Sequence, residues 1–154
     1  LAKRVSDLHT GSLTQAAVAR FCARGHYRRH VEHLRDVYRE RQRVLLDAME
    51  RHLPPGIGWT RPEGGFVLWV TLPPALGSSD VLRDAREAGV IATPGGCFFH
   101  GDQGEQHLRL SFARTDVDAI ERGIRALGAV MRRRLAREPE PRPSRRPARA
   151  LPQL

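Results

Sequence analysis

The stretch that best indicates the fold of this chain is His107-Leu108-Arg109-Leu110-Ser111-Phe112-Ala113. Side chains alternate between the two faces of a β-strand, so the apolar Leu108, Leu110 and Phe112 lie together on one face. Arg109 lies on the other face. Burial of the apolar side chains fixes the register of this strand, because a slip of one residue would bury the guanidinium.

Arg109 is the candidate binding residue of this stretch. A guanidinium held in a fixed strand can bind a carboxylate through two parallel hydrogen bonds, which a flexible ammonium does less well. A strand arginine that simply faces solvent explains the same alternation. The alternation alone leaves both interpretations open.

Two helices are predicted before this strand. Ser12 and Gln15 have the spacing of a capping box, and the helix that they open ends at Gly25. A second helix of about 26 residues follows, up to Pro54-Pro55-Gly56. The apolar residues of the first helix are Leu13, Ala17 and Phe21, and those of the second are Val31, Leu34, Tyr38, Leu45 and Met49.

Two more strands and two more helices are predicted between residues 58 and 131. Nearly continuous apolar residues from 66 to 72 indicate a strand covered on both faces, and residues 90–93 form a short strand. Asp80 is expected to cap a short helix that ends near Gly89. Thr115 and Asp118 form a second capping box, whose helix buries Val117, Ile120, Ile124, Leu127 and Met131. The result is an α+β unit of about three strands with packed helices.

Several motifs follow one another in a fixed order along the chain. They are Ser12-Leu13-Thr14-Gln15, the helix of residues 30–43, WTRPEGGFVLW at residues 59–69, Gly89-Val90, Pro94-Gly95-Gly96-Cys97-Phe98-Phe99, and Leu108-Arg109-Leu110-Ser111-Phe112. Together they cover roughly residues 1 to 131. In order and spacing they resemble the C-terminal part of the fold-type I pyridoxal-phosphate-dependent aminotransferases of class I and II, close to the 2-aminoadipate and kynurenine aminotransferase branch.

This resemblance implies a fold, a cofactor and a role for Arg109. Residues 58–131 would be the small domain of a pyridoxal-phosphate transferase, preceded in residues 1–57 by the end of the large domain and a long inter-domain helix. The implied reaction transfers an amino group between an amino acid and a 2-oxo acid, with pyridoxal phosphate as cofactor. By its place in the LRLSF motif, Arg109 would bind the α-carboxylate of the substrate. A homodimer is implied for the complete protein.

The resemblance also implies residues that this chain lacks. Members of the family form an internal aldimine with a lysine in a serine-rich stretch, followed by an arginine that binds the cofactor phosphate. Both lie before the Ser-Leu-Thr-Gln helix. The only lysine of this chain is Lys3, which lacks that context and lies too close to Ser12. We therefore expect a C-terminal fragment, inactive alone, with no catalytic or cofactor-binding residue of its own.

Two other classes of protein are compatible with parts of this pattern. The effector domain of GntR/MocR-type transcriptional regulators is an aminotransferase-like module behind a DNA-binding domain, and its sequence resembles that of the enzymes. A winged-helix domain before this chain would identify a regulator. A small α+β binding module unrelated to the cofactor accounts for the composition but not for the ordered motifs.

Composition changes near residue 132. Residues 132–154 contain eight arginines and two glutamates, which is a net charge of +6 out of +9 for the chain, together with five of its eleven prolines. Because this segment has almost no large apolar side chains, it is expected to be a disordered tail. It has no aromatic side chain for base stacking and no amphipathic period, so neither a specific nucleic acid nor a membrane is an expected partner.

The remaining residue classes predict no further site. Cys22 and Cys97 follow no metal-ligand or disulfide spacing, which favours a reducing, cytoplasmic compartment, and Cys97 is expected to be a packed side chain. His26, His30 and His33 lie near one helix face, but the arginines between them would repel a cation. No metal site is therefore expected.

Overall fold

The computed structural model describes residues 11–137, apart from the side chains of residues 101–103. Lys3 and residues 138–154 lie outside the described residues, so the expectations for them stay predictions. The helices are α2 (Ser12–Ala23), α3 (His26–His52), α4 (Ser78–Glu87) and α5 (Val117–Leu135). The strands are β1 (Gly58–Trp59), β2 (Val67–Thr71), β3 (Thr93–Pro94) and β4 (His107–Ser111), with 3₁₀ turns η1 (Gly95–Cys97) and η2 (Gly101–Gln106).

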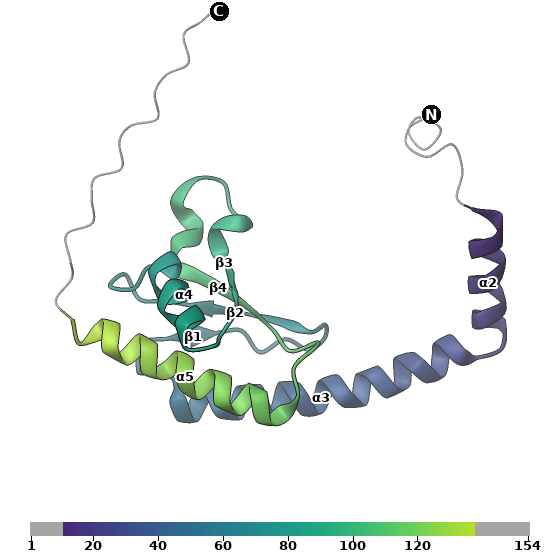
Figure 1. Ribbon diagram of the computed structural model, residues 1–154, viewed down its shortest axis with the longest axis horizontal. Helices are drawn as coiled ribbons and strands as arrows, with labels where there is room; N and C mark the ends of the chain where they lie inside the picture. Colours follow the sequence, from purple (N-terminus) through teal and green to yellow (C-terminus); the bar gives the residue numbers. More distant parts are fainter. Residues whose placement is uncertain (1–10, 138–154) are drawn as a thin grey trace, which may run out of the picture.

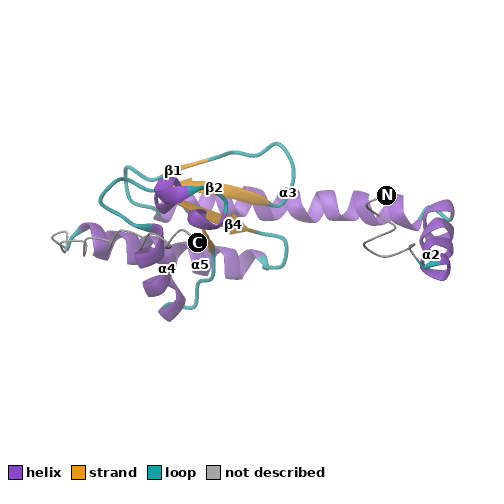
Figure 2. Ribbon diagram, turned by 90° about the horizontal axis from the view of Figure 1, so that it is seen from above, coloured by secondary structure: helices purple, strands orange, loops and turns teal. Residues whose placement is uncertain are grey.

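Helix α3 runs from beneath the sheet to α2 at its far end (Figure 1). Gly25 separates the two helices at a φ of 75°, a backbone conformation that glycine adopts without strain. The buried residues of α3 are Leu45, Ala48 and Met49, all in its C-terminal half. Its N-terminal half and α2 extend away from the sheet in Figure 2. The stripe predicted for α3 is therefore only half-buried at its N-terminal end.

The four strands form one antiparallel sheet in the order β1-β2-β4-β3. In the central pair, Leu68 lies opposite Leu110, and Trp69 lies opposite Arg109. On the other side of β4, Thr93 lies opposite the same Arg109. Arg109 therefore projects from a strand that is paired along both edges.

One face of the sheet packs onto the helices in a single hydrophobic core. Leu108 and Val70 are 0% exposed, and Leu110 and Phe112 are also buried, which confirms the register predicted for β4. Helix α5 packs against both α3 and α4. It contributes Ile120, Ile124, Leu127, Val130 and Met131 to this core. Val117, which was expected to be buried with them, is exposed in the first turn of the helix.

Three helices begin at residues other than the predicted ones. Gly11 rather than Ser12 is the N-cap of α2, and Gly77 rather than Asp80 is that of α4. Helix α5 is capped by Asp116, whose Oδ1 accepts a hydrogen bond from the backbone N–H of Ala119 at 2.7 Å. A cap requires extended backbone at its own position, and Asp116 has a ψ of 164°. Spacing of polar residues does not reveal this backbone geometry.

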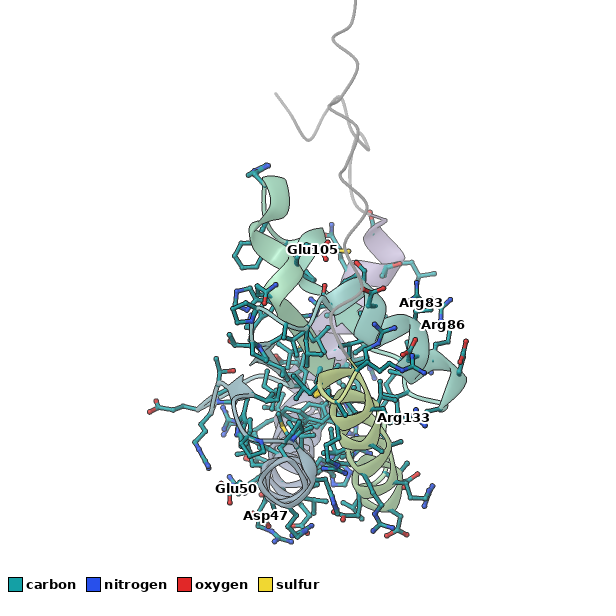
Figure 3. The ribbon with its side chains drawn as sticks, turned by 90° about the vertical axis from the view of Figure 1, so that its left-hand side faces the viewer. Asp47, Glu50, Arg83, Arg86, Glu105 and Arg133 are labelled. Carbon is teal, nitrogen blue, oxygen red and sulfur yellow. The ribbon has the colours of Figure 1, made fainter. Side chains whose placement is uncertain are left out.

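The remaining differences concern the ends of elements. The short strand β1 was not predicted, and the strand expected at residues 90–93 lies at Thr93–Pro94 instead. Helix α5 continues to Leu135, past the expected start of the tail at residue 132. Figure 3 shows Arg133 on α5 with Arg83 and Arg86 of α4 along the same side of the molecule. Among the described helices, none combines the length and apolar character that a membrane span requires.

Candidate functional site

Arg109 lies on the face of the sheet opposite the core, as the alternation in β4 predicts. Leu108 and Leu110, its neighbours along β4, are buried in the core, whereas Arg109 itself is partly exposed. Trp69, directly across in β2, lies on the same outer face because paired residues share a face. The outer face thus carries a cation and a large aromatic ring side by side.

Aromatic rings gather around this arginine. The Cζ atom of Arg109 lies 4.4 Å from the centroid of the Phe98 ring, within the range of a cation–π contact. Trp69 meets Phe98 edge-on at 5.3 Å and Phe99 at 5.9 Å between ring centroids. The Phe99 ring stacks on the imidazole of His107 at 5.3 Å. The rings of Phe98 and Phe99 are themselves partly open, 44% and 38% exposed.

The guanidinium of Arg109 has a donor with no partner. Its Nε is buried and has no hydrogen-bond partner among the described residues. A buried donor without a partner costs free energy, on the order of 1 to 3 kcal/mol and more for a charged group. The carboxylate of a ligand would satisfy this donor and the terminal nitrogens of the same fork. The outer face is therefore suited to binding an anion with a planar carboxylate.

The loop that carries Phe98 is held at its base by a close backbone approach. Gly95 is buried, and a Cβ at this position would lie 2.5 Å from the carbonyl oxygen of Gly104. The backbone N–H of Phe98 donates to the carbonyl of Gly95 at 2.8 Å. The need for a tight turn does not by itself account for this contact. Gly95 is needed because the chain returns over itself there.

Helix α3 ties the end of β4 to the glycine turn at Gly64-Gly65. Arg41 donates to the carbonyl oxygen of Phe112 at 3.4 Å and also to that of Ala113. The next residue, Gln42, donates to the carbonyl of Pro62. These two side chains belong to the charged face of α3, and sequence reasoning did not single them out. Arg41 fixes the end of the strand that carries Arg109 against the long helix, and Gln42 fixes the segment before the glycine turn.

A groove of about 740 Å³ lies between α3 and the glycine turn. Gly65, at a φ of 80°, has a left-handed backbone that glycine adopts without strain. The groove does not include Arg109. It is lined by Val31, Leu34, Arg35, Tyr38, Arg39, Gln42, Glu63, Gly64, Gly65 and Phe66.

The other candidates from sequence have clear positions. Cys97 is exposed in its 3₁₀ turn, which contradicts the expectation of a packed side chain. Within residues 11–137 no three His, Cys, Asp or Glu side chains gather as metal ligands would. The same residues include no lysine, so the described part of the chain has no group that would bind pyridoxal phosphate covalently. What it offers is the partly exposed guanidinium of Arg109, whose Nε has no partner among the described residues.

Comparisons with known proteins agree on one family. The family model for aminotransferase class I and II matches residues 1–127. The 2-aminoadipate transaminase of Thermus thermophilus is 40% identical over 135 residues, which are 88% of this chain and 34% of that protein. The solved structure of the α-aminoadipate aminotransferase LysN from Thermus thermophilus, complexed with N-(5'-phosphopyridoxyl)-L-leucine, has a TM-score of 0.80 at 39% identity, covering 88% of this chain and 34% of that one.

Transcriptional regulators are also similar. The HTH-type regulator YdfD of Bacillus subtilis is 28% identical over 130 residues, which are 84% of this chain and 27% of the regulator. The chain thus spans between about a quarter and a third of the length of these relatives.

The antiparallel sheet packed on α3, α4 and α5 is the α+β unit of a pyridoxal-phosphate-dependent aminotransferase fold, as the sequence predicted. The chain belongs to the class I and II aminotransferase family.

Proposed function

We propose that this chain forms the carboxylate-binding part of a pyridoxal-phosphate-dependent aminotransferase, in which Arg109 holds the α-carboxylate of the amino acid and of the 2-oxo acid. The observation that carries this proposal is the buried Nε of Arg109, which has no partner among the described residues. The 2-aminoadipate transaminase of Thermus thermophilus supports the same reaction class.

The geometry suits a substrate-orienting role. Two parallel hydrogen bonds from a guanidinium fix both the position and the plane of a carboxylate. Fixing that plane determines how the bonds of the α-carbon are oriented, and orientation is the main contribution of a protein to cofactor chemistry. In the complete protein the amino group is carried by pyridoxal phosphate, the cofactor of this class of enzymes. Arg109 would serve both half-reactions because the amino acid and the oxo acid share the carboxylate.

The complete protein would have features that this chain alone does not. We infer that the lysine and the phosphate-binding arginine come from segments before Ser12, that residues 58–131 act as the small domain after the inter-domain helix, and that the enzyme is a homodimer. The described cysteines, Cys22 and Cys97, are both free and exposed, which supports a reducing compartment such as the cytoplasm. Without the aldimine lysine, this chain would be inactive by itself.

Amino-group transfer by the complete gene product tests the proposal. The product is incubated with pyridoxal phosphate, an amino acid panel and 2-oxoglutarate, and glutamate formation is measured. Transfer that depends on added cofactor is expected. A purified product that binds the cofactor yet transfers no amino group from any member of the panel would contradict the enzymatic assignment.

An effector domain of a transcriptional regulator is the second candidate. The observation that favours it is the similarity to two HTH-type regulators of Bacillus subtilis, each 28% identical to this chain. Arg109 would then bind the carboxylate of an amino acid effector. The gene product would contain a winged-helix segment before residue 1 and would shift a DNA fragment from its own promoter, which an enzyme would not do.

A further inference from the structure

The Arg109 fork is held by a ring rather than by a carboxylate. Its Cζ lies 4.4 Å from the centroid of Phe98, and its Nε is buried without a partner among the described residues. An aspartate or glutamate in that place would accept hydrogen bonds from the fork and compete with a ligand for its donors. An aromatic face attracts the cation through its quadrupole and accepts none of the in-plane N–H groups. The ring therefore leaves the hydrogen-bond donors of the fork available to a carboxylate.

Phe98 is in turn fixed from two directions. Its ring meets Trp69 at 5.3 Å and 87°, an edge-to-face arrangement that aromatic pairs favour. Its backbone N–H donates to Gly95, at the crowded base of the loop. Trp69 lies directly opposite Arg109 in the sheet. Trp69 therefore packs against the ring of Phe98, and this ring packs against the guanidinium of Arg109.

We propose that Phe98 is a positioning residue that holds the plane of the Arg109 guanidinium for carboxylate binding, with Trp69 fixing the ring of Phe98. This inference rests on the proposed function of Arg109. Phe98 would act on Arg109 and not on the side chain of the substrate. Its replacement should therefore affect small and large substrates equally.

The first arm uses nuclear magnetic resonance on the chain labelled with ¹⁵N-arginine. The Hε signal of Arg109, identified by its loss in Arg109→Lys, is expected at an upfield position because the aromatic ring current shields protons over the ring face. Phe98→Leu should remove this shift and Phe98→Tyr should retain it. Phe99→Leu is the matched control, because the Phe99 ring contacts Trp69 and His107. Backbone signals of the same samples show whether each variant is folded.

The second arm uses kinetics of the complete gene product with alanine and phenylalanine as small and large donor substrates. Phe98→Leu is expected to lower kcat/KM for both by a similar factor, about 2- to 30-fold, while Phe98→Tyr recovers most of the loss. A loss confined to phenylalanine would overturn the proposal and make Phe98 a contact for the substrate side chain. An unshifted Arg109 signal in folded wild type would overturn it as well.

If Arg109→Ala leaves kcat/KM unchanged, the proposed function fails. If Arg109→Ala abolishes activity while Phe98→Leu behaves as wild type in both arms, only the positioning role of Phe98 fails.

Discussion

The backbone of α5 at Gly128 lies directly against the carbonyl of His52, the last residue of α3: a Cβ on Gly128 would lie 2.1 Å from that oxygen. Arg132, one turn further along α5, donates to the same carbonyl oxygen at 2.6 Å. The free carbonyl at the end of α3 is thus bonded by a side chain of α5. This contact fixes how closely the two long helices cross.

We predict that Gly128→Ala destabilises the fold by about 1 to 3 kcal/mol, because the two helix backbones must move apart. Gly123 in the same helix is the matched control, since nothing lies within 4 Å of a Cβ built there. Gly123→Ala should stabilise by roughly 0.5 to 1 kcal/mol through helix propensity. Urea unfolding of both variants measures the difference, and equal midpoints would contradict the close approach.

A second contact between the same helices is pH-sensitive. Hydrogen bonds from His52 and from Arg51, each at 2.6 Å, lower the pKa of Glu121 from 4.5 to about 2. A carboxyl whose pKa is lower in the folded state stabilises the fold above its unfolded pKa and loses this contribution as the pH falls through its folded pKa. Wild type should therefore exceed Glu121→Gln in stability near neutral pH, with the gap closing between pH 4.5 and about pH 2. Denaturant midpoints across that range measure the gap, and a gap independent of pH would disprove the assignment.

The last turn of α5 is attached to α4 by Arg134, whose Nε and Nη2 donate to both carboxylate oxygens of Asp84 at 2.7 and 2.8 Å. Hydrogen bonding from Arg134 also holds the pKa of Asp84 below its usual value. Because the pair is partly buried, Arg134→Ala should cost about 1 to 2 kcal/mol, between the values for exposed and buried pairs. The exposed Arg133, labelled in Figure 3, is the control, and its alanine variant should change stability by less than about 0.5 kcal/mol. Thermal unfolding compares the two, and equal losses would show that the bidentate pair contributes nothing specific.

The sequence is sufficient to predict the register of β4 and the face on which Arg109 lies, because only one register buries all three apolar residues of this strand. It is also sufficient for the long helix α3, whose apolar stripe and flanking Gly25 and Pro54 are local signals. The cap at Asp116 and the strand β1 were missed, since neither a ψ angle nor a two-residue pairing leaves a period in the sequence.

The aromatic surroundings of Arg109 could not be predicted for a different reason. Phe98 is eleven residues from Arg109 and Trp69 is forty, so their contact depends on how the loop returns over the sheet. Glycines before Phe98 are compatible with an ordinary turn, so the close approach of Gly95 to Gly104 leaves no distinct signal in the sequence. The sequence does contain one indication of this cluster. Trp69 alternates with Leu68 and Val70, which are buried, so Trp69 lies on the outer face of the sheet.

The chain itself is predicted not to retain pyridoxal phosphate. Lys3 is its only lysine, and residues 11–137 offer no other amine for a covalent bond. After incubation with the cofactor and desalting, the absorbance of a lysine-bound cofactor should be absent. The result that would contradict this prediction is a retained absorbance band that disappears in Lys3→Ala.

The central claim, that Arg109 binds the substrate carboxylate, is tested most directly by steady-state kinetics of Arg109→Ala in the complete gene product. Loss of one partner of a buried charge pair costs about 2 to 5 kcal/mol, so kcat/KM should fall roughly 30- to 3,000-fold for an amino acid and for its 2-oxo acid alike. The cofactor should stay bound, Arg109→Lys should recover only part of the loss, and Arg122→Ala on the exposed side of α5 should behave as wild type. Near-normal kcat/KM for both substrates in Arg109→Ala would contradict the account.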